Sequence, residues 1–229
     1  FASSLEESGA VSRVGRIRVV LYGSLSLTGL GHGTDRAILA GLEGNVPATV
    51  DTDYLLSVRE RCAHDGTIHV NGTNAIAYDD DGDMVFDRWK RLAPHPNGMR
   101  FQAFDAQGNI IDEQVWYSIG GGFIRRGRID DALISNHEQT PASSQPPKDS
   151  GNDETAEYGD GVPYPFVSCD GLIDLCRKHH LSIADVVWAN ETARRSPQEV
   201  RDRLTRIWNV MSHCIDAGCA SASPTLPGG

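Results

Sequence analysis

Residues 16–35, with the sequence RIRVVLYGSLSLTGLGHGTD, decide how the first part of the chain folds. The segment Arg16–Ser24 is rich in β-branched and large apolar residues, which predicts a buried strand. Glycines and polar residues follow at once, a pattern that brings a backbone close to a small ligand. Thr34 or Asp35 is then predicted to cap a helix that ends at Gly44.

Helical and strand patterns alternate through the rest of residues 1–135. The predicted elements are helices over 1–8 and 51–62, short strands over 67–70, 75–79 and 84–89, and a hairpin formed by 99–105 and 110–118. The acidic run Asp80–Asp83 is predicted to be the hairpin turn between the second and third short strands. The fold class expected for this domain is therefore α/β (α+β) with a mixed sheet and much antiparallel pairing.

Two further regions follow, with different compositions. Residues 136–163 are rich in proline, serine and acidic residues and predict a disordered linker. Residues 164–229 carry three amphipathic helical patterns, typical of the start of a larger all-α domain. The last of these helices is predicted to bury Val200, Leu204, Ile207, Trp208, Met211 and Ile215. The first and last residues both look cut, so we expect a fragment of a longer protein.

Composition excludes several classes of function. The net charge is −10, which argues against nucleic-acid and anionic-membrane surfaces, since both need clustered Lys and Arg. No apolar run approaches the ~20 residues of a membrane span, and no signal-peptide pattern opens the chain. The odd count of five cysteines, with no zinc spacing, indicates reduced thiols, a cytoplasmic location and no metal site within this chain. The three lysines are not in settings typical of pyridoxal phosphate chemistry.

His32 is the candidate proton acceptor. It lies between two glycines, which leave its ring little cover, and an imidazole titrates near neutral pH. The N–H groups of the first helical turn, at Thr34 and Asp35, could attract a carboxylate. The alternatives are a structural turn histidine, and an Asp35 that acts only as a helix cap or as the partner of a nearby arginine.

Two more stretches have similar features. His95-Pro96-Asn97-Gly98 reads as a tight turn, in which His95 and Asn97 could hold the carboxylate and ammonium groups of an amino acid. The turn alone could also explain the pattern. The three glycines at 120–122 predict either a flexible exit from a strand or a close approach of the backbone to a ligand or partner domain.

Together these blocks resemble the bacterial iron–sulfur L-serine dehydratases. The resemblance rests on 21–36, His95–Met99 and Tyr117–Phe123, and beyond the linker on Tyr164-Pro165-Phe166, Ala189-Asn190-Glu191 and Leu226-Pro227-Gly228-Gly229. It implies a β domain similar to the allosteric substrate-binding domain of some phosphoglycerate dehydrogenases, and an α domain that holds a [4Fe–4S] cluster. It also implies a homodimer that converts L-serine to pyruvate and ammonia in amino-acid metabolism and gluconeogenesis.

By the same resemblance, His32 is the catalytic base. The residues expected to bind L-serine, at the active site or for regulation, are Ser24, Thr34, Asp35, His95, Asn97 and Gly98. The cluster ligands are expected beyond Gly229, so this segment alone is not expected to turn over serine. Two alternatives stay open: a stand-alone amino-acid-binding regulatory module, and an α/β interaction domain without ligand.

Overall fold

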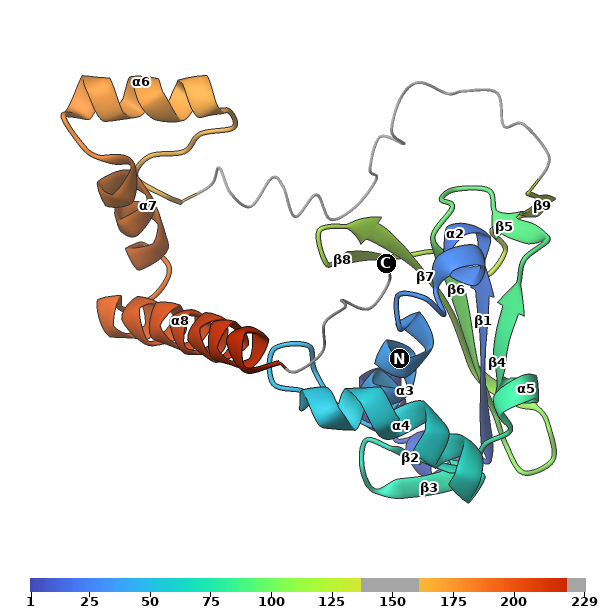
Figure 1. The fold of residues 1–229 in the computed structure, drawn as a ribbon. Helices are drawn as coiled ribbons and strands as arrows, with labels where there is room; N and C mark the ends of the chain where they lie inside the picture. Colours follow the sequence, from blue (N-terminus) through green and yellow to red (C-terminus); the bar gives the residue numbers. More distant parts are fainter. Residues whose placement is uncertain (137–160, 222–229) are drawn as a thin grey trace. The chain divides into compact units, whose positions relative to one another are not determined.

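The computed structural model describes residues 1–136 and 161–221 of the chain. The chain divides into two compact units, Phe1–Ser144 and Gln145–Gly229 (Figure 1). Most of the predicted linker, 136–163, lies outside the described residues. In the part of the chain that is described, no helix combines the length and the apolar character needed to cross a bilayer.

The first unit is built on a mixed sheet with the strand order β2-β3-β1-β6-β7-β8, in which β4 also pairs with β1. The strands of this sheet are β1 (Arg16–Tyr22), β2 (Thr67–Val70), β3 (Asn74–Ala77), β4 (Met84–Asp87), β6 (Gly98–Phe104), β7 (Ile110–Gly120) and β8 (Phe123–Arg126). A small second sheet pairs β5 (Lys90–Leu92) with β9 (Leu133–Ser135). The predicted α/β class and mixed sheet are confirmed.

The acidic run is not a hairpin turn, and that prediction is wrong. Residues Asp80–Asp83 form a short helix, α5, between β3 and β4. Both strands run parallel to β1, with Ala77 beside Arg16 and Met84 beside Val19. The two strands therefore follow one another along the same side of β1 and run in the same direction, with α5 between them. The chain does not reverse its direction there, as it would in a hairpin.

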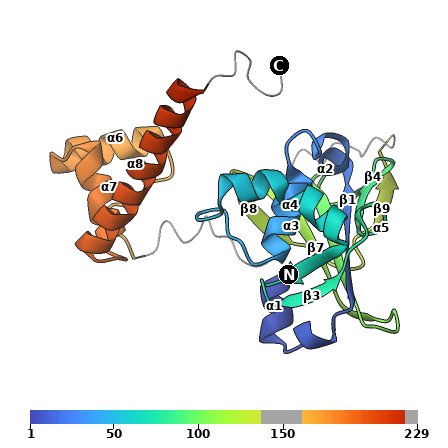
Figure 2. The ribbon, with the colours of Figure 1, turned by 60° about the horizontal axis from the view of Figure 1, so that its bottom comes forward.

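Helices cover one face of the sheet (Figure 2). They are α1 (Ala2–Glu7), α3 (Thr34–Leu42) and α4 (Thr52–Asp65). A 3-10 turn, η1 (Val11–Arg13), follows α1, and the short helix α2 (Gly23–Thr28) precedes α3. Leu5, Leu39 and Val58 from these helices are fully buried with alternate residues of β1. Asp51 caps α4, since its carboxylate accepts the N–H groups of residues 53 and 54.

The other face of the sheet carries a smaller buried cluster. Val20 and Tyr22 from β1 pack there with Val115 and Tyr117 from β7 and with a leucine of β5. The segment after β8 crosses this cluster: the N–H of residue 127 donates to the carbonyl of Val115 at 2.7 Å. The hydroxyl of Tyr117 donates to Asp131 at 2.6 Å. One end of this face is thereby covered.

The second unit contains the three predicted helices, α6 (Cys169–His179), α7 (Ile183–Thr192) and α8 (Pro197–Ala220). A serine caps each one, at Ser168, Ser182 and Ser196. The full capping box is at Ser182, where the side chains of Ser182 and Asp185 each accept the other's backbone N–H.

The predicted burial of the α8 stripe is wrong apart from its first member. Val200 is 6% exposed, whereas Leu204 and Trp208 are 56% and 61% exposed. The more C-terminal members, Ile207, Met211 and Ile215, are exposed as well. Periodicity marks which face of a helix is apolar, but burial also needs a second element opposite that face. In the described part of this unit, α7 contacts α8 near the start of the long helix, where the guanidinium of Arg201 lies over the Trp188 ring.

Candidate functional site

Antiparallel pairing brings the ends of three strands to one edge of the sheet. Leu21, near the end of β1, pairs with Met99 of β6, and Gly98 at the start of β6 pairs with Tyr117 near the end of β7. The segments that follow β1, precede β6 and end β7 must therefore meet there. These are the three glycine-containing stretches that the sequence singled out.

Hydrogen bonds join the three stretches through the 95–98 turn. The backbone N–H of Ser24 donates to the carbonyl of Pro96 at 3.0 Å. The N–H of Ser118 donates to the carbonyl of Asn97 at 3.0 Å, and the Asn97 side-chain amide donates back to the Ser118 carbonyl at 3.2 Å. The turn is thus held between the start of α2 and the end of β7.

Gly23 makes the close approach of α2 to this turn possible. Its φ is +55°, a conformation that side chains disfavour, and a Cβ placed on it would lie 2.2 Å from the Pro96 carbonyl oxygen. Gly98 is also closely packed, since a Cβ there would lie 2.7 Å from Leu92. Gly23 requires glycine because the atom it would meet belongs to the backbone, whereas a Cβ on Gly98 would displace the Leu92 side chain, so packing favours glycine there whether or not Gly98 contacts a ligand.

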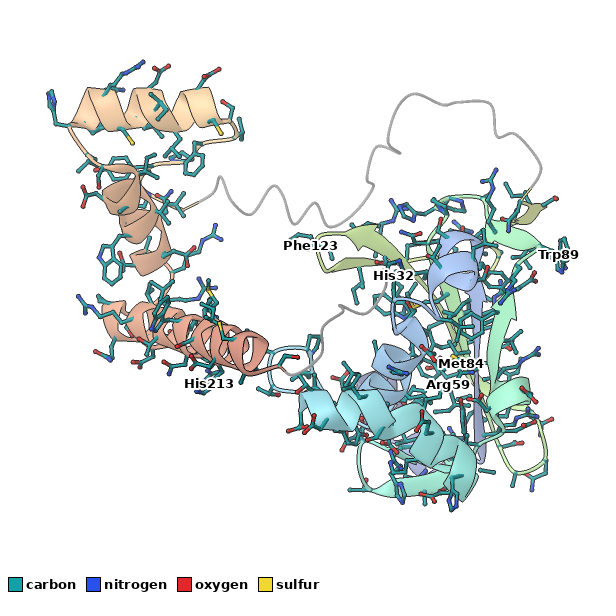
Figure 3. All side chains as sticks on the ribbon, in the orientation of Figure 1. His32, Arg59, Met84, Trp89, Phe123 and His213 are labelled. Carbon is teal, nitrogen blue, oxygen red and sulfur yellow. The ribbon has the colours of Figure 1, made fainter. Side chains whose placement is uncertain are left out.

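His32 lies in the turn between α2 and α3, and its side chain is exposed (Figure 3). Its backbone N–H donates to the carbonyl of Gly29 at 3.2 Å, which holds the turn. Within residues 1–136 and 161–221, no hydrogen bond or ion pair occupies its ring nitrogens. The ring is therefore open to solvent with both nitrogens unbonded in the described residues, and it is not bonded to the 95–98 turn.

Thr34 and Asp35 do not cap α3, which corrects the prediction. The N-cap is Gly33, with a φ of 69° and no side-chain cap. Asp35 lies in the first turn, buried to 3% exposure, and its Oδ2 accepts from Nη1 of Arg59 on α4 at 2.5 Å. The alternative reading of Asp35 as the partner of an arginine is confirmed. The N–H of Thr34 is also used, because it donates to the Gly29 carbonyl.

Arg59 is the residue that the sequence reasoning did not identify. Besides Asp35, its guanidinium holds Asp80 at 2.8 Å, and Asp80 also accepts the hydroxyl of Tyr78 at 2.7 Å. These bonds lower the pKa of Asp80, and the largest contribution comes from the hydrogen bond of Arg59. A signal existed, since Arg59 adjoins the buried Val58 on α4, where an arginine near the core needs an acidic partner.

The side chains of the 95–98 turn are largely occupied within it. The Nδ1 of His95 accepts the backbone N–H of Asn97 at 3.1 Å, and the ring lies 6.1 Å from that of Tyr117. Burial, and then the charge of Arg125, lower the pKa of His95 below its usual value. His95 is thus a neutral acceptor near pH 7, and the amide nitrogen of Asn97 is already bonded.

The three glycines at 120–122 form the turn between β7 and β8. Their φ angles are +102°, +61° and +86°, all in the region that favours glycine. A Cβ on Gly120 or Gly122 would meet nothing within 4 Å. The tight turn therefore accounts for these glycines within the described residues, and a close approach of the backbone to a ligand or partner domain stays a prediction.

Metal-ligating side chains do not gather anywhere in the described ranges. No three His, Cys, Asp or Glu residues there are close enough together to hold a metal ion. All five cysteines are free thiols; Cys62 is buried, while Cys169, Cys214 and Cys219 are exposed. These residues do not fit an iron–sulfur cluster.

Comparison with known proteins identifies the family. A family model described as "Serine dehydratase beta chain" matches residues 1–128. The chain belongs to this family. Its β-chain segment therefore includes β1 to β8 and all three stretches that meet at the edge of the sheet.

Curated relatives match beyond the β-chain segment. The chain is 37% identical over 229 residues to an L-serine dehydratase of Streptomyces coelicolor, covering 100% of this chain and 46% of the relative. It is 34% identical over 232 residues to L-serine dehydratase 1 of Escherichia coli, covering 100% of the chain and 45% of the relative. The chain thus spans a little under half the length of these relatives.

Proposed function

We propose that the protein is part of an L-serine ammonia-lyase, which converts L-serine to pyruvate and ammonia. The similarity of the whole chain to proteins named L-serine dehydratase carries this proposal. The reaction removes the α proton and the β hydroxyl of serine as water, leaving 2-aminoacrylate. This tautomerises to the imine, and a second water hydrolyses the imine to pyruvate and ammonia.

In this proposal His32 is the base that takes the α proton. Its exposed ring, with no bond to another described side chain, supports the role, since a general base must reach the substrate with a free nitrogen. We place Ser24 and Thr34, on either side of the His32 turn, among the groups that contact serine. Asp35 has a positioning role, because its carboxylate is bound to Arg59.

His95, Asn97 and Gly98 belong to the same proposal, in binding or regulation by serine. The neutral Nδ1 of His95 and the amide of Asn97 already hold the turn, so we assign them to shaping the edge of the sheet. The Nε2 of His95 and the Oδ1 of Asn97 are the atoms that we assign to contact with serine. Gly98 contributes through its close packing on β5.

We further propose a [4Fe–4S] cluster as cofactor, with ligands outside the described residues. The described residues hold no suitable ligand set, and we derive no step through the cluster. A cytoplasmic homodimer, a role in gluconeogenesis and a resemblance of the β domain to allosteric substrate-binding domains are parts of the same proposal. The assignment of the helices α6, α7 and α8 to the start of an all-α catalytic domain is also part of this proposal.

The test is turnover of L-serine by the full-length gene product, purified without oxygen. We expect pyruvate and ammonia in equal amounts, measured by a coupled lactate dehydrogenase assay and an ammonia assay. D-Serine serves as the control. A protein that retains its cofactor but forms no pyruvate, while L-serine still binds in a calorimeter, would replace the lyase by an amino-acid-binding module.

A further inference from the structure

An open cavity of about 650 Å³ lies at the opposite end of β1 from the candidate site. Its walls come from the start of β1, from α5 and from the turn between β6 and β7, which Figure 1 shows at the same end of the sheet. Arg16, Arg18 and Phe104 line it. The volume falls in the range typical of sites for small molecules.

Strand alternation places the two arginines side by side. Ile17 and Val19 are buried in the core beneath the helices, so Arg16 and Arg18 project from the opposite face. Residues two apart on a strand are about 7 Å from each other. Phe104 of β6 is the cross-strand partner of Arg16. It therefore lies on the same face and adds an apolar wall.

The two guanidinium groups differ in their partners. Nε of Arg16 is bonded to Asp83, a buried carboxylate. The Nε of Arg18 is also buried, yet it has no hydrogen-bond partner in the described part of the chain, and no acidic side chain there pairs with Arg18. A buried donor on a charged group is costly to leave unpaired.

The acidic groups around Arg18 are already bonded elsewhere. The carboxylate of Asp105, in the cavity wall, accepts the backbone N–H groups of Gln107 at 2.9 Å and Asn109 at 2.8 Å. Glu113, on the same face of β7, accepts from Arg100 at 3.2 Å and from a glutamine of β6 at 2.8 Å. Neither acid forms an ion pair with Arg18.

We propose that this cavity binds a small oxyanion through the guanidinium of Arg18, with Arg16 as the second cation. A guanidinium matches the paired oxygens of a carboxylate or a phosphate group. The ligand class is thus a small metabolite that carries one of these two groups. The site is separate from the candidate catalytic edge and does not depend on the proposed reaction.

The experiment titrates the 229-residue chain with inorganic phosphate and, separately, with acetate, at constant ionic strength. Amide shifts in an NMR spectrum locate the binding, and the titration gives the Kd. We expect shifts in residues 15–18 and 104–108. We also expect Arg18→Gln to weaken the Kd at least about tenfold, as for a lost charged hydrogen bond.

The matched control is Arg88→Gln, an exposed arginine after β4, which should leave the Kd within about twofold. Binding of phosphate alone would assign phosphate esters as the ligand class, and binding of acetate alone would assign carboxylates. Absence of shifts in residues 15–18 and 104–108 of the wild-type chain would overturn the proposal. So would equal affinity in the wild type and in an Arg18→Gln variant that retains its melting temperature.

Discussion

At the scale of single residues, the candidate edge contains side chains without a hydrogen-bond partner in the described residues, His32 among them, and side chains that already have one. His32 is exposed with its ring unbonded in the described structure, while Asp35, His95 and Asn97 already have partners. This contrast separates a group that is available for proton transfer from groups that hold the backbone in place. The first three predictions test the two kinds of role.

His32→Ala should lower the kcat of the full-length enzyme for L-serine at least about 100-fold, the usual contribution of a general base. The fold should be unaffected, since the ring makes no bond within the described residues. His64→Ala, at an exposed histidine of α4, is the control and should keep the wild-type kcat. A near-normal kcat in His32→Ala would remove the residue from the role of base.

Arg59→Met should lower the free energy of unfolding by about 3 kcal/mol, because it leaves the buried Asp35 carboxylate without its partner. Arg128→Met is the matched control: Arg128 and Asp130 form an exposed pair, and its loss should change the stability much less than the loss of Arg59. Urea unfolding measures both. Equal losses in the two variants would show that the Asp35 pair is not important for stability.

His95 should make stability depend on pH. Its pKa is lowered in the folded chain, so the unfolded chain binds a proton first as the pH falls. The contribution of neutral His95 is therefore fully present above its unfolded value of about 6.5 and is lost below it. Between pH 7 and pH 5 the wild type should lose more stability than His95→Gln, measured by urea unfolding. Parallel losses would contradict the burial effect.

At the scale of elements, the junction between β1 and α2 shapes the candidate edge. The strand ends at Tyr22, and α2 starts at the next residue, Gly23, which takes a positive φ and lies against the 95–98 turn. The contact between Ser24 and Pro96 exists only because Gly23 leaves room for it. A one-residue change at this junction should therefore affect both the stability of the chain and the geometry of the candidate edge.

Gly23→Ala should lower the free energy of unfolding by at least about 2 kcal/mol, from the unfavourable φ and the overlap with the Pro96 carbonyl. The control is Gly41→Ala in α3, where a Cβ meets nothing within 4 Å. That change should stabilise the chain by about 0.5–1 kcal/mol, because alanine favours helix. A Gly23→Ala variant as stable as wild type would show that the backbone shifts easily here.

At the scale of the whole molecule, the β-chain segment and the three-helix unit are distinct units of one chain. The helical unit carries Cys169, Cys176, Cys214 and Cys219, and none of them joins a metal-binding group within the described ranges. We therefore predict that Cys214→Ser leaves the iron content of the full-length protein unchanged. Iron per polypeptide and the absorbance of the proposed cluster measure this, and loss of iron would assign Cys214 as a ligand.

Much of the secondary structure could be predicted from local patterns. The β1 strand, the 99–118 hairpin and the three C-terminal helices lie close to their predicted positions, because apolar periodicity and caps are local signals. The acidic run was mispredicted for a physical reason. Asp80–Asp83 has the composition of a turn, but which strands it connects depends on pairing with β1, which is distant in sequence.

The candidate site shows the same division. The sequence by itself determined the three glycine-containing stretches, the unshielded histidine between glycines and the family resemblance, because these depend on residue type and spacing alone. Only the tertiary structure decided that the stretches meet at one sheet edge, that Arg59 holds Asp35 and that the α8 stripe stays exposed in the described residues. Such features depend on contacts between segments far apart in the chain, and local pattern carries no information on them.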